Sequence, residues 1–411
     1  MKKIWIAVVL IIAMIVSGCA QNVVTAAVAG NLMTGIIENT VDPGDTTSDT
    51  AEFAVNLLKT TYNGENTVLS PLSAYLALAM TSNGATGLTL REFERVLGAR
   101  TRELNDTGKI LLDAINASPD VTLKSVNGIW YNTDSGFVPA GDFLQTNADY
   151  FGAAAVAADF SKPETVNAIN RFVSENTNGL IDKMLDKLDG SVMVLINTLY
   201  FKGDWANQFD PNDTTDALFT LTDGETIYTP TMEQEFDAVS YFESENAKGI
   251  ILPYVDDRYA YVAILPAGAV SDFVSALSAD GFKALLDAST EQTVKLYLPK
   301  YELDGSYDLN EVLKSMGLAS AFDPDKADFS AMGSAELGNI YIDKVKQNTV
   351  FKLGEKGTEA AAATSVQMEL SAMEVAQELI ELHLDRPFVY ALMDMETMTP
   401  LFLGVLENPA G

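Results

Sequence analysis

Helical and strand-like patterns are unevenly divided between the two halves of this 411-residue chain, and this division constrains the fold more than any other feature. In the first half, apolar residues recur at helical spacing, as Phe53, Ala54, Leu57 and Leu58 do. In the second half, most apolar stretches are short and rich in residues that favour strands. We therefore predict a mixed domain of the α+β class.

One expected helix is apolar nearly all round. Ser70 precedes Pro71 and offers a side-chain cap to this helix, which continues through residues 72–80. A helix without a polar face is expected in the centre of the protein. Other helices are expected at 90–97, 104–115 and around 166–173, with two short ones at 270–277 and 309–316.

One strand is expected in the first half of the chain, at 121–130. The others are expected after residue 190, at 192–201, 250–254, 259–265, 293–298, 340–353, 388–393 and 401–406. The run at 192–201 is continuously apolar, which suits a strand that is buried on both faces. No repeat of 20 to 50 residues recurs, and no linker-like composition divides the chain. We expect one α+β domain over residues 48–411.

The scarcity of histidine and cysteine excludes several classes of enzyme. The chain has one histidine, His383, and one cysteine, Cys19. A lone histidine in a region that resembles a strand is more often an incidental surface residue than a catalyst, so neither a catalytic triad nor a structural zinc site is expected. No phosphate loop, dinucleotide fingerprint or complete EF-hand is present. We expect no catalytic residue, no metal and no cofactor, and His383 is expected to be an incidental surface residue.

Charge and cysteine content restrict partners and stability. A net charge of -31, spread along the chain, opposes binding to phosphate backbones, so nucleic acid is not expected as a partner. A single cysteine cannot form a disulfide within the chain. The stability of the domain must therefore come from packing.

The first residues are typical of an export signal. Lys2 and Lys3 precede an apolar run at 4–16, which is short for a membrane span. The run ends in Val16-Ser17-Gly18-Cys19, which resembles the lipobox of prokaryotic lipoproteins and implies that Cys19 is lipidated.

A plain secretory signal with an incidental cysteine is the alternative. On either interpretation residues 1–19 are a signal peptide and residues 20–47 a flexible tether, because the latter show no clear period. We expect an exported protein, either a lipoprotein attached to the cell-surface membrane or a secreted one.

Residues 358–370 alternate with a period of two. Thr358, Ala360, Ala362, Thr364, Val366, Met368 and Leu370 fall on one side, and more polar residues fall on the other. This alternation is what a half-buried strand requires. The four consecutive alanines at 360–363 also favour a helix, so the sequence of this segment is compatible with both a strand and a helix.

Seven short motifs resemble those of the serpin family, in the family's order and approximate spacing over residues 50–411. They are Ser70-Pro-Leu-Ser73, Asn197-Thr-Leu-Tyr-Phe-Lys-Gly-Asp-Trp205, Leu298-Pro-Lys300, Gly354-Glu-Lys-Gly-Thr-Glu-Ala360, Arg386-Pro-Phe-Val389, Leu401-Phe-Leu-Gly404 and Asn408-Pro409. The resemblance implies the serpin fold, with three β-sheets, eight or nine helices and an exposed reactive loop near the C-terminus, here about residues 355–386.

The resemblance also implies a function. Inhibitory serpins are monomers that trap a target serine protease in a covalent complex, when the protease cleaves the reactive loop and the loop inserts into the central sheet. The chain is thus expected to be a protease inhibitor and not an enzyme. A non-inhibitory serpin that acts as a cell-surface binding protein remains the alternative.

Site residues follow from the same resemblance. The hinge and inserting segment correspond to Glu355, Gly357, Thr358, Ala360, Ala361, Ala362, Ala363 and Thr364. Residues that control opening of the sheet correspond to Lys300, Trp205, Asn197, Ser70, Ser73 and Gln347; many relatives have histidine where Gln347 stands.

Counting from the hinge places the scissile bond at Ser371-Ala372. Because the loop is about five residues longer than in common relatives, Leu370, Met373 and Glu369 are alternative cleavage positions. Small and aliphatic residues here suit an elastase-like or subtilisin-like protease, and residues 357–385 contain no Lys or Arg for a trypsin-like one.

Overall fold

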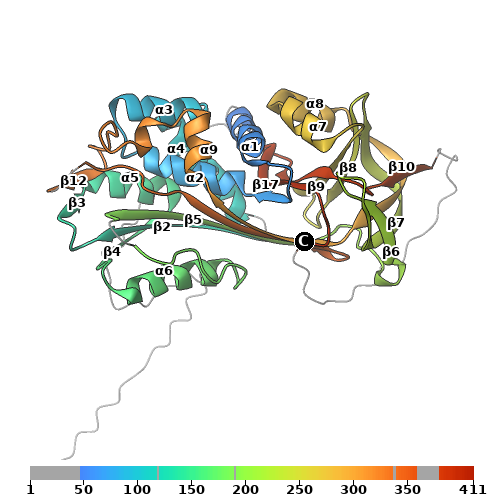
Figure 1. The fold of residues 1–411 in the computed structure, drawn as a ribbon, viewed down its shortest axis with the longest axis horizontal. Helices are drawn as coiled ribbons and strands as arrows, with labels where there is room; N and C mark the ends of the chain where they lie inside the picture. Colours follow the sequence, from blue (N-terminus) through green and yellow to red (C-terminus); the bar gives the residue numbers. More distant parts are fainter. Residues whose placement is uncertain (1–46, 118–119, 189–190, 337–338, 359–378) are drawn as a thin grey trace, which may run out of the picture.

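The computed structural model describes residues 47–117, 120–188, 191–336, 339–358 and 379–411 (Figure 1). These residues form nine α-helices and three β-sheets, as predicted. Within this described part, no helix is long and apolar enough to cross a membrane.

The nine α-helices lie mostly in the first half of the chain. They are α1 (Thr47–Thr61), α2 (Pro71–Ser82), α3 (Gly87–Leu97), α4 (Thr101–Ala117), α5 (Gly141–Phe151), α6 (Pro163–Asn176), α7 (Val270–Ala276), α8 (Ala279–Asp287) and α9 (Asn310–Met316). Neither α5 nor α8 was predicted. Both are short amphipathic helices that pack one face against the core, where Phe143 and Phe282 are buried.

Helix α2 is buried in the centre, as predicted, with ten of its twelve residues buried. The predicted cap is wrong in one respect. Ser70 is the residue before the helix, but its hydroxyl makes no cap hydrogen bond and instead donates to Leu401 O at 3.1 Å. Because Ser70 lies against the strand that contains Leu401, a bond between elements replaces the local one.

The largest sheet has nine strands. Their order is β1 (Thr67–Leu69), β17 (Thr399–Leu406), β16 (Phe388–Asp394), β9 (Tyr259–Pro266), β8 (Ala247–Pro253), β7 (Thr226–Glu243), β10 (Thr290–Pro299) and β15 (Ile380–His383), with β6 (Thr215–Thr220) paired to β7. The 18-residue β7 was not predicted, because its sequence is polar at many positions. It is held by ladders to β6, β8 and β10.

The second sheet has six strands and crosses the middle of the molecule (Figure 1). Their order is β11 (Tyr301–Asp308), β13 (Lys346–Gly354), β14 (Gly357–Thr358), β5 (Met193–Asp204), β2 (Thr122–Asn132) and β4 (Ala154–Ala158). The strand predicted at 340–353 begins only at Lys346, and the residues before it have no regular structure. Strands β12 (Gly333–Ala335) and β3 (Phe137–Pro139) form the third sheet.

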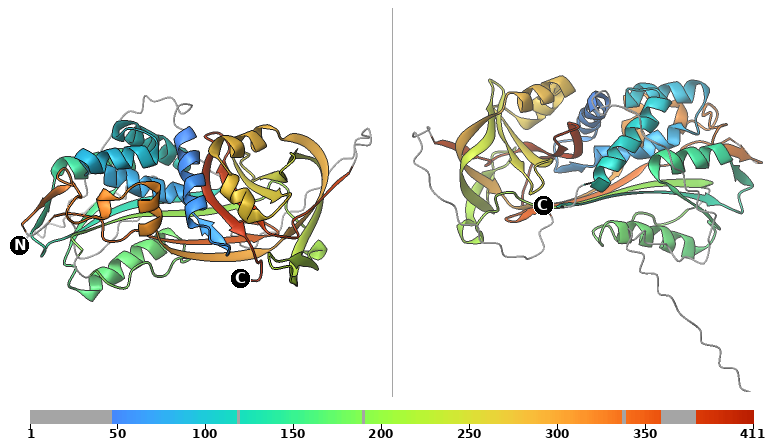
Figure 2. Two further views of the ribbon diagram at one scale, coloured as in Figure 1. Left: turned by 45° about the horizontal axis from the view of Figure 1, so that its top comes forward. Right: turned by 180° about the vertical axis from the view of Figure 1, so that it is seen from behind.

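Helices cover both faces of the six-stranded sheet. The first five helices and α9 lie on one face, and α6 lies on the other, as the opposed views show (Figure 2). The main core lies on the helical side, while a separate cluster under α6 contains Trp130, Ile169, Phe172 and Ile196. The sheet is thus the middle layer between two hydrophobic clusters.

Candidate functional site

Strands β5 and β13 border the same gap in the six-stranded sheet and, in the described structure, do not pair with each other. The short strand β14 lies between them at one end and is antiparallel to both, so β5 and β13 run parallel. Thr358 is opposite Leu353 of β13 and Gly203 of β5. Beyond that point neither strand has a ladder partner on its inner edge among the residues that the structure describes.

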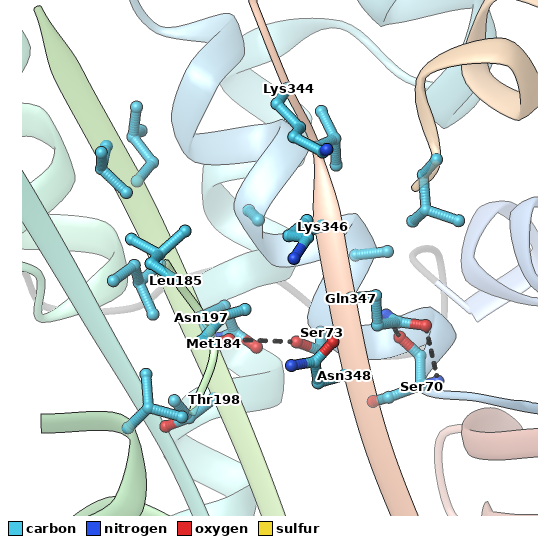
Figure 3. Close-up of a pocket in the computed structure, with 18 of the residues that line it drawn as sticks. Ser70, Ser73, Met184, Leu185, Asn197, Thr198, Lys344, Lys346, Gln347 and Asn348 are labelled. Carbon is cyan, nitrogen blue, oxygen red and sulfur yellow. Dashed lines mark hydrogen bonds between the residues drawn. The ribbon is translucent and has the colours of Figure 1, made fainter. Parts of the chain in front are cut away.

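A cavity of about 850 Å³ lies where this pairing is missing. Its lining comes from β5, β13, helix α2 and the segment 180–188 that follows α6. Figure 3 shows the two strands with side chains from both directed into the space between them. We call this space the slot, its β14 end the mouth, and the part over α2 the floor.

Residue 357, at the mouth, must be a glycine because its backbone lies very close to the backbone of Gly203. Gly357 has φ +148, and a Cβ added there would lie 2.0 Å from Gly203 O. Next to it, Thr358 is buried and its hydroxyl hydrogen-bonds the hydroxyl of Tyr254. Burial raises the pKa of Tyr254 well above its ordinary value, which keeps the phenol protonated as a hydrogen-bonding group.

Trp205 fixes the turn that leads into β14. Its backbone N–H donates to Lys356 O at 2.8 Å, and its indole Nε1 donates to Gly354 O at 3.0 Å. The indole ring is buried and stacks on Tyr254, with ring centroids 4.6 Å apart. The turn is thus held by two hydrogen bonds and by an aromatic stack at once.

An ion pair closes the same turn from outside. Lys300 Nζ lies 2.8 Å from Glu355 Oε1, and Thr214 Oγ1 donates to the same oxygen at 3.1 Å. Burial raises the pKa of Glu355, but the hydrogen bond and charge of Lys300 outweigh it, and the pKa lies below its usual value. The carboxylate therefore stays ionised at neutral pH.

A polar cluster lies on the floor of the slot (Figure 3). Gln347 donates from Nε2 to Ser70 O at 2.8 Å and accepts from Ser70 N–H at 3.2 Å, so its amide supplies both a donor and an acceptor. Ser73 Oγ donates to Asn197 O at 3.4 Å. The cluster thus links α2 to both strands that border the slot.

The sequence-predicted residues at the mouth and floor are therefore brought together. Sequence reasoning missed Tyr254, which touches both Thr358 and Trp205, and Ser125 and Asn127, which accept from Asn197 Nδ2. No local sequence pattern identifies these three residues, because each contacts the site from a different strand that is distant in the sequence.

Strand β15 follows the predicted loop and pairs in parallel with β10. His383, expected to be incidental, stacks on Tyr297 with ring centroids 4.1 Å apart, while about half of its side chain remains exposed. It therefore contributes to holding this edge strand.

The remaining predicted site residues lie outside the described residues. These are Cys19, Ala360, Ala361, Ala362, Ala363, Thr364, Glu369, Leu370, Ser371, Ala372 and Met373.

The chain is similar to known proteins in both sequence and structure. The family model described as "Serpin (serine protease inhibitor)" matches residues 48–409. An uncharacterized serpin-like protein of Thermococcus kodakarensis is 33% identical over 356 residues, covering 84% of this chain and 82% of its own. Corticosteroid-binding globulin of Oryctolagus cuniculus is 30% identical, covering 84% of this chain and 90% of its own.

The solved structures include a thermophilic serpin, Tengpin, in two states. Its native state matches with a TM-score of 0.84 and 34% identity, covering 91% of this chain and 97% of that chain. Its latent state matches with a TM-score of 0.79 and 35% identity, covering 90% and 100%. The present structure is thus more similar to the native than to the latent form of that protein.

Proposed function

The chain belongs to the serpin family, and from that premise we propose that it inhibits a serine protease as a single-use substrate. The observation that carries the proposal is the slot, where β5 and β13 border an open space without pairing in the described part of the chain, and where β14 already occupies the mouth. Two open strand edges that face each other are a template for one more strand.

The chemistry begins as ordinary proteolysis. The protease serine Oγ attacks the carbonyl carbon of Ser371, and the bond from Ser371 to Ala372 breaks. The new amino group of Ala372 takes the proton that the serine hydroxyl loses through the protease's own base. The protease is then held to Ser371 by an ester, and this chain contributes the substrate rather than a catalytic group.

Insertion of the freed segment then drags the bound protease across the molecule, and the resulting distortion of the trapped enzyme prevents hydrolysis of the ester. A strand that extends β14 down the slot runs antiparallel to both neighbours and satisfies the inner edges of both. About 13 inserted residues at roughly 3.3 Å each carry the bound protease about 40 Å. Ladder hydrogen bonds and burial gained in this step make the uncleaved form metastable and kinetically trapped.

Side chains near the proposed bond favour elastase-like or subtilisin-like targets. Residues around Ser371 are small or aliphatic, and no Lys or Arg occurs between residues 357 and 385. Leu370, Met373 and Glu369 are the alternative cleavage positions. A trypsin-like pocket would find no basic side chain in this segment.

The test is incubation of the purified protein with elastase and with subtilisin. We expect a complex that survives denaturing electrophoresis, with a released C-terminal peptide whose mass begins at Ala372. A protease whose serine is replaced by alanine is the matched control and should give no such complex. Cleavage without a complex by every protease tried would contradict inhibition.

A non-inhibitory binding protein on the same scaffold is the second candidate. Corticosteroid-binding globulin, by its name a binding protein, covers most of this chain, so family membership alone does not separate the two functions. Under this candidate, cleaved protein accumulates and no ester-linked complex forms. The electrophoresis above therefore decides between them.

The proposal includes export and a lipid anchor at Cys19. The basic and apolar signal pattern and the lipobox-like residues before Cys19 support it. Expression in a bacterial host with labelled palmitate should label the wild-type chain and leave Cys19→Ser unlabelled and released. Equal release of both proteins would instead support a plain secretory signal. We expect the exported inhibitor to be a monomer.

A further inference from the structure

The ladder between β6 and β7 carries two large apolar side chains that the fold leaves uncovered. Leu218 and Tyr228 are opposite each other in this ladder, and their side chains are 52% and 72% exposed. Phe219 and Thr229, the next residues along each strand, are buried, as the alternation of a strand requires. An apolar pair thus lies on the solvent side of the ladder, where polar residues are usual. We call this side the outer face.

The chain around β6 is hydrogen-bonded to both ends of the expected reactive loop. Thr214 Oγ1, just before β6, donates to Glu355 Oε1 at 3.1 Å. At the other end of β6, the Thr220 N–H donates to Asp385 O at 2.8 Å, shortly after β15. The six residues of β6 span about 17 Å at roughly 3.3 Å each. The apolar pair therefore lies between the point where the chain enters the loop and the point where it returns.

The surroundings of the apolar pair are strongly acidic. Residues 203–247 contain eleven Asp or Glu and no Lys, Arg or His. The carboxylates that are exposed close to the two strands in the sequence belong to Asp210, Asp213, Asp216, Asp223 and Glu225. None of these five residues forms an ion pair with another described residue. The outer face is thus an apolar centre with an acidic rim that has no internal counter-charge.

A second copy of this chain does not fit such a surface. Each copy has a net charge of -31, and a two-fold contact would bring two acidic rims together. Two exposed side chains also cover far less than the roughly 800 Å² that each partner buries in a stable interface. The outer face therefore suits an additional contact with a basic protein that is already held elsewhere on the molecule.

We propose that the outer face is a docking surface for the body of the target protease, and that it selects proteases with a basic surface beside their active site. This inference rests on the proposed inhibition, because the protease must engage the reactive loop while it touches the ladder. Leu218 and Tyr228 supply the apolar contact, and the carboxylates attract the basic surface during the encounter. The outer face sets the rate of the encounter and takes no part in loop insertion.

The first test measures the second-order rate constant for inhibition of subtilisin and of elastase. The double variant Leu218→Ala with Tyr228→Ala should lower it by roughly five- to tenfold at an unchanged stoichiometry of inhibition. Tyr228→Phe keeps the ring and should keep the rate. The matched control is Val138→Ala, because Val138 is 63% exposed on β3 at the opposite end of the molecule (Figure 1), and it should also keep the rate. All four proteins should unfold alike in urea, since these side chains are exposed.

A second test concerns the charge of the partner. Asp216→Lys should slow inhibition severalfold at low ionic strength and much less in about 0.5 M NaCl, where surface charges are screened. Asp142→Lys makes the same change of charge at an exposed residue of α5 and should stay close to the wild-type rate. Succinylation of the protease's lysines should abolish the advantage of the wild type over Asp216→Lys. Equal rates for Asp216→Lys and Asp142→Lys would overturn the assignment to a basic partner.

The outcomes separate this inference from the function beneath it. If the wild type forms no denaturant-stable complex with any protease, inhibition fails and the docking surface fails with it. If the complex forms and the double variant inhibits as fast as Val138→Ala, inhibition stands and the docking surface is overturned. A raised stoichiometry at an unchanged rate would also overturn it, because the ladder would then act on loop insertion and not on the encounter.

Discussion

The mouth and the floor of the slot lie on the same two strands but differ in how many of their polar groups have hydrogen-bond partners. At the mouth, Trp205 donates to Gly354 O, Tyr254 hydrogen-bonds to Thr358, and Lys300 pairs with Glu355. On the floor, the strand edges are open and the side-chain oxygens of Asn197 and Thr349 have no partner among the described residues. The mouth is thus arranged to hold a segment, and the floor to receive one.

The largest effect is expected from a charge on the inserting face at the mouth. Thr358→Arg would bury an unpaired guanidinium beside Tyr254, which costs several kcal/mol. The variant should become a substrate, with the stoichiometry of inhibition raised more than about tenfold. Titration of residual protease activity measures this number.

The matched control is Glu359→Arg, because residue 359 belongs to the polar side of the alternation. It should inhibit with nearly the wild-type stoichiometry. Equal inhibition by Thr358→Arg and Glu359→Arg would show that the mouth does not select the inserting face.

A smaller effect on stability is expected at Gln347, a residue of the floor whose side chain already has hydrogen-bond partners. Gln347→Leu removes both hydrogen bonds to the backbone of Ser70 and leaves the buried Ser70 N–H unpaired, whereas Ser70 O keeps its bond from the Ala74 N–H. The free energy of unfolding of the intact protein should fall by about 1–3 kcal/mol in urea.

Asn348→Ala is the neighbouring control. Its side chain bonds to surface groups on the other face of β13, so it should cost less than about 0.5 kcal/mol. A Gln347→Leu protein as stable as this control would mean that water replaces the lost partners.

The ion pair at the mouth should contribute less and should depend on pH. The pKa of Glu355 is lowered in the folded state, so its contribution is complete above the unfolded pKa and is lost as pH falls through the folded one. Glu355→Gln should destabilise by under about 1 kcal/mol at pH 7, because Lys300 is 37% exposed and solvent screens the pair.

Urea unfolding at pH 7 and at pH 3.5 measures the difference between wild type and Glu355→Gln. The difference should shrink at the lower pH. A constant difference would indicate that the amide disturbs packing, and that the charge of Glu355 is unimportant.

The smallest effect is expected from Ser73→Ala. Its hydroxyl donates to Asn197 O at 3.4 Å, which is long for a hydroxyl bond. Urea unfolding should change by less than about 0.5 kcal/mol. A loss above about 1 kcal/mol would show that the floor is more tightly held than its distances indicate, and would weaken the contrast with the mouth.

The α+β class, the buried helix α2, the apolar strand β5 and the family could all be predicted from the amino-acid sequence, because they depend on local periodicity and on short ordered motifs. The sequence also placed Lys300, Trp205, Asn197 and Gln347 in one functional group. Three features became visible only in the folded protein. Among the described residues β5 and β13 have no partner below Thr358, Ser70 bonds to Leu401 rather than capping its helix, and Tyr254 completes the mouth. Each of these depends on which partner a backbone or side chain meets across the fold, and no local pattern in the sequence specifies that choice.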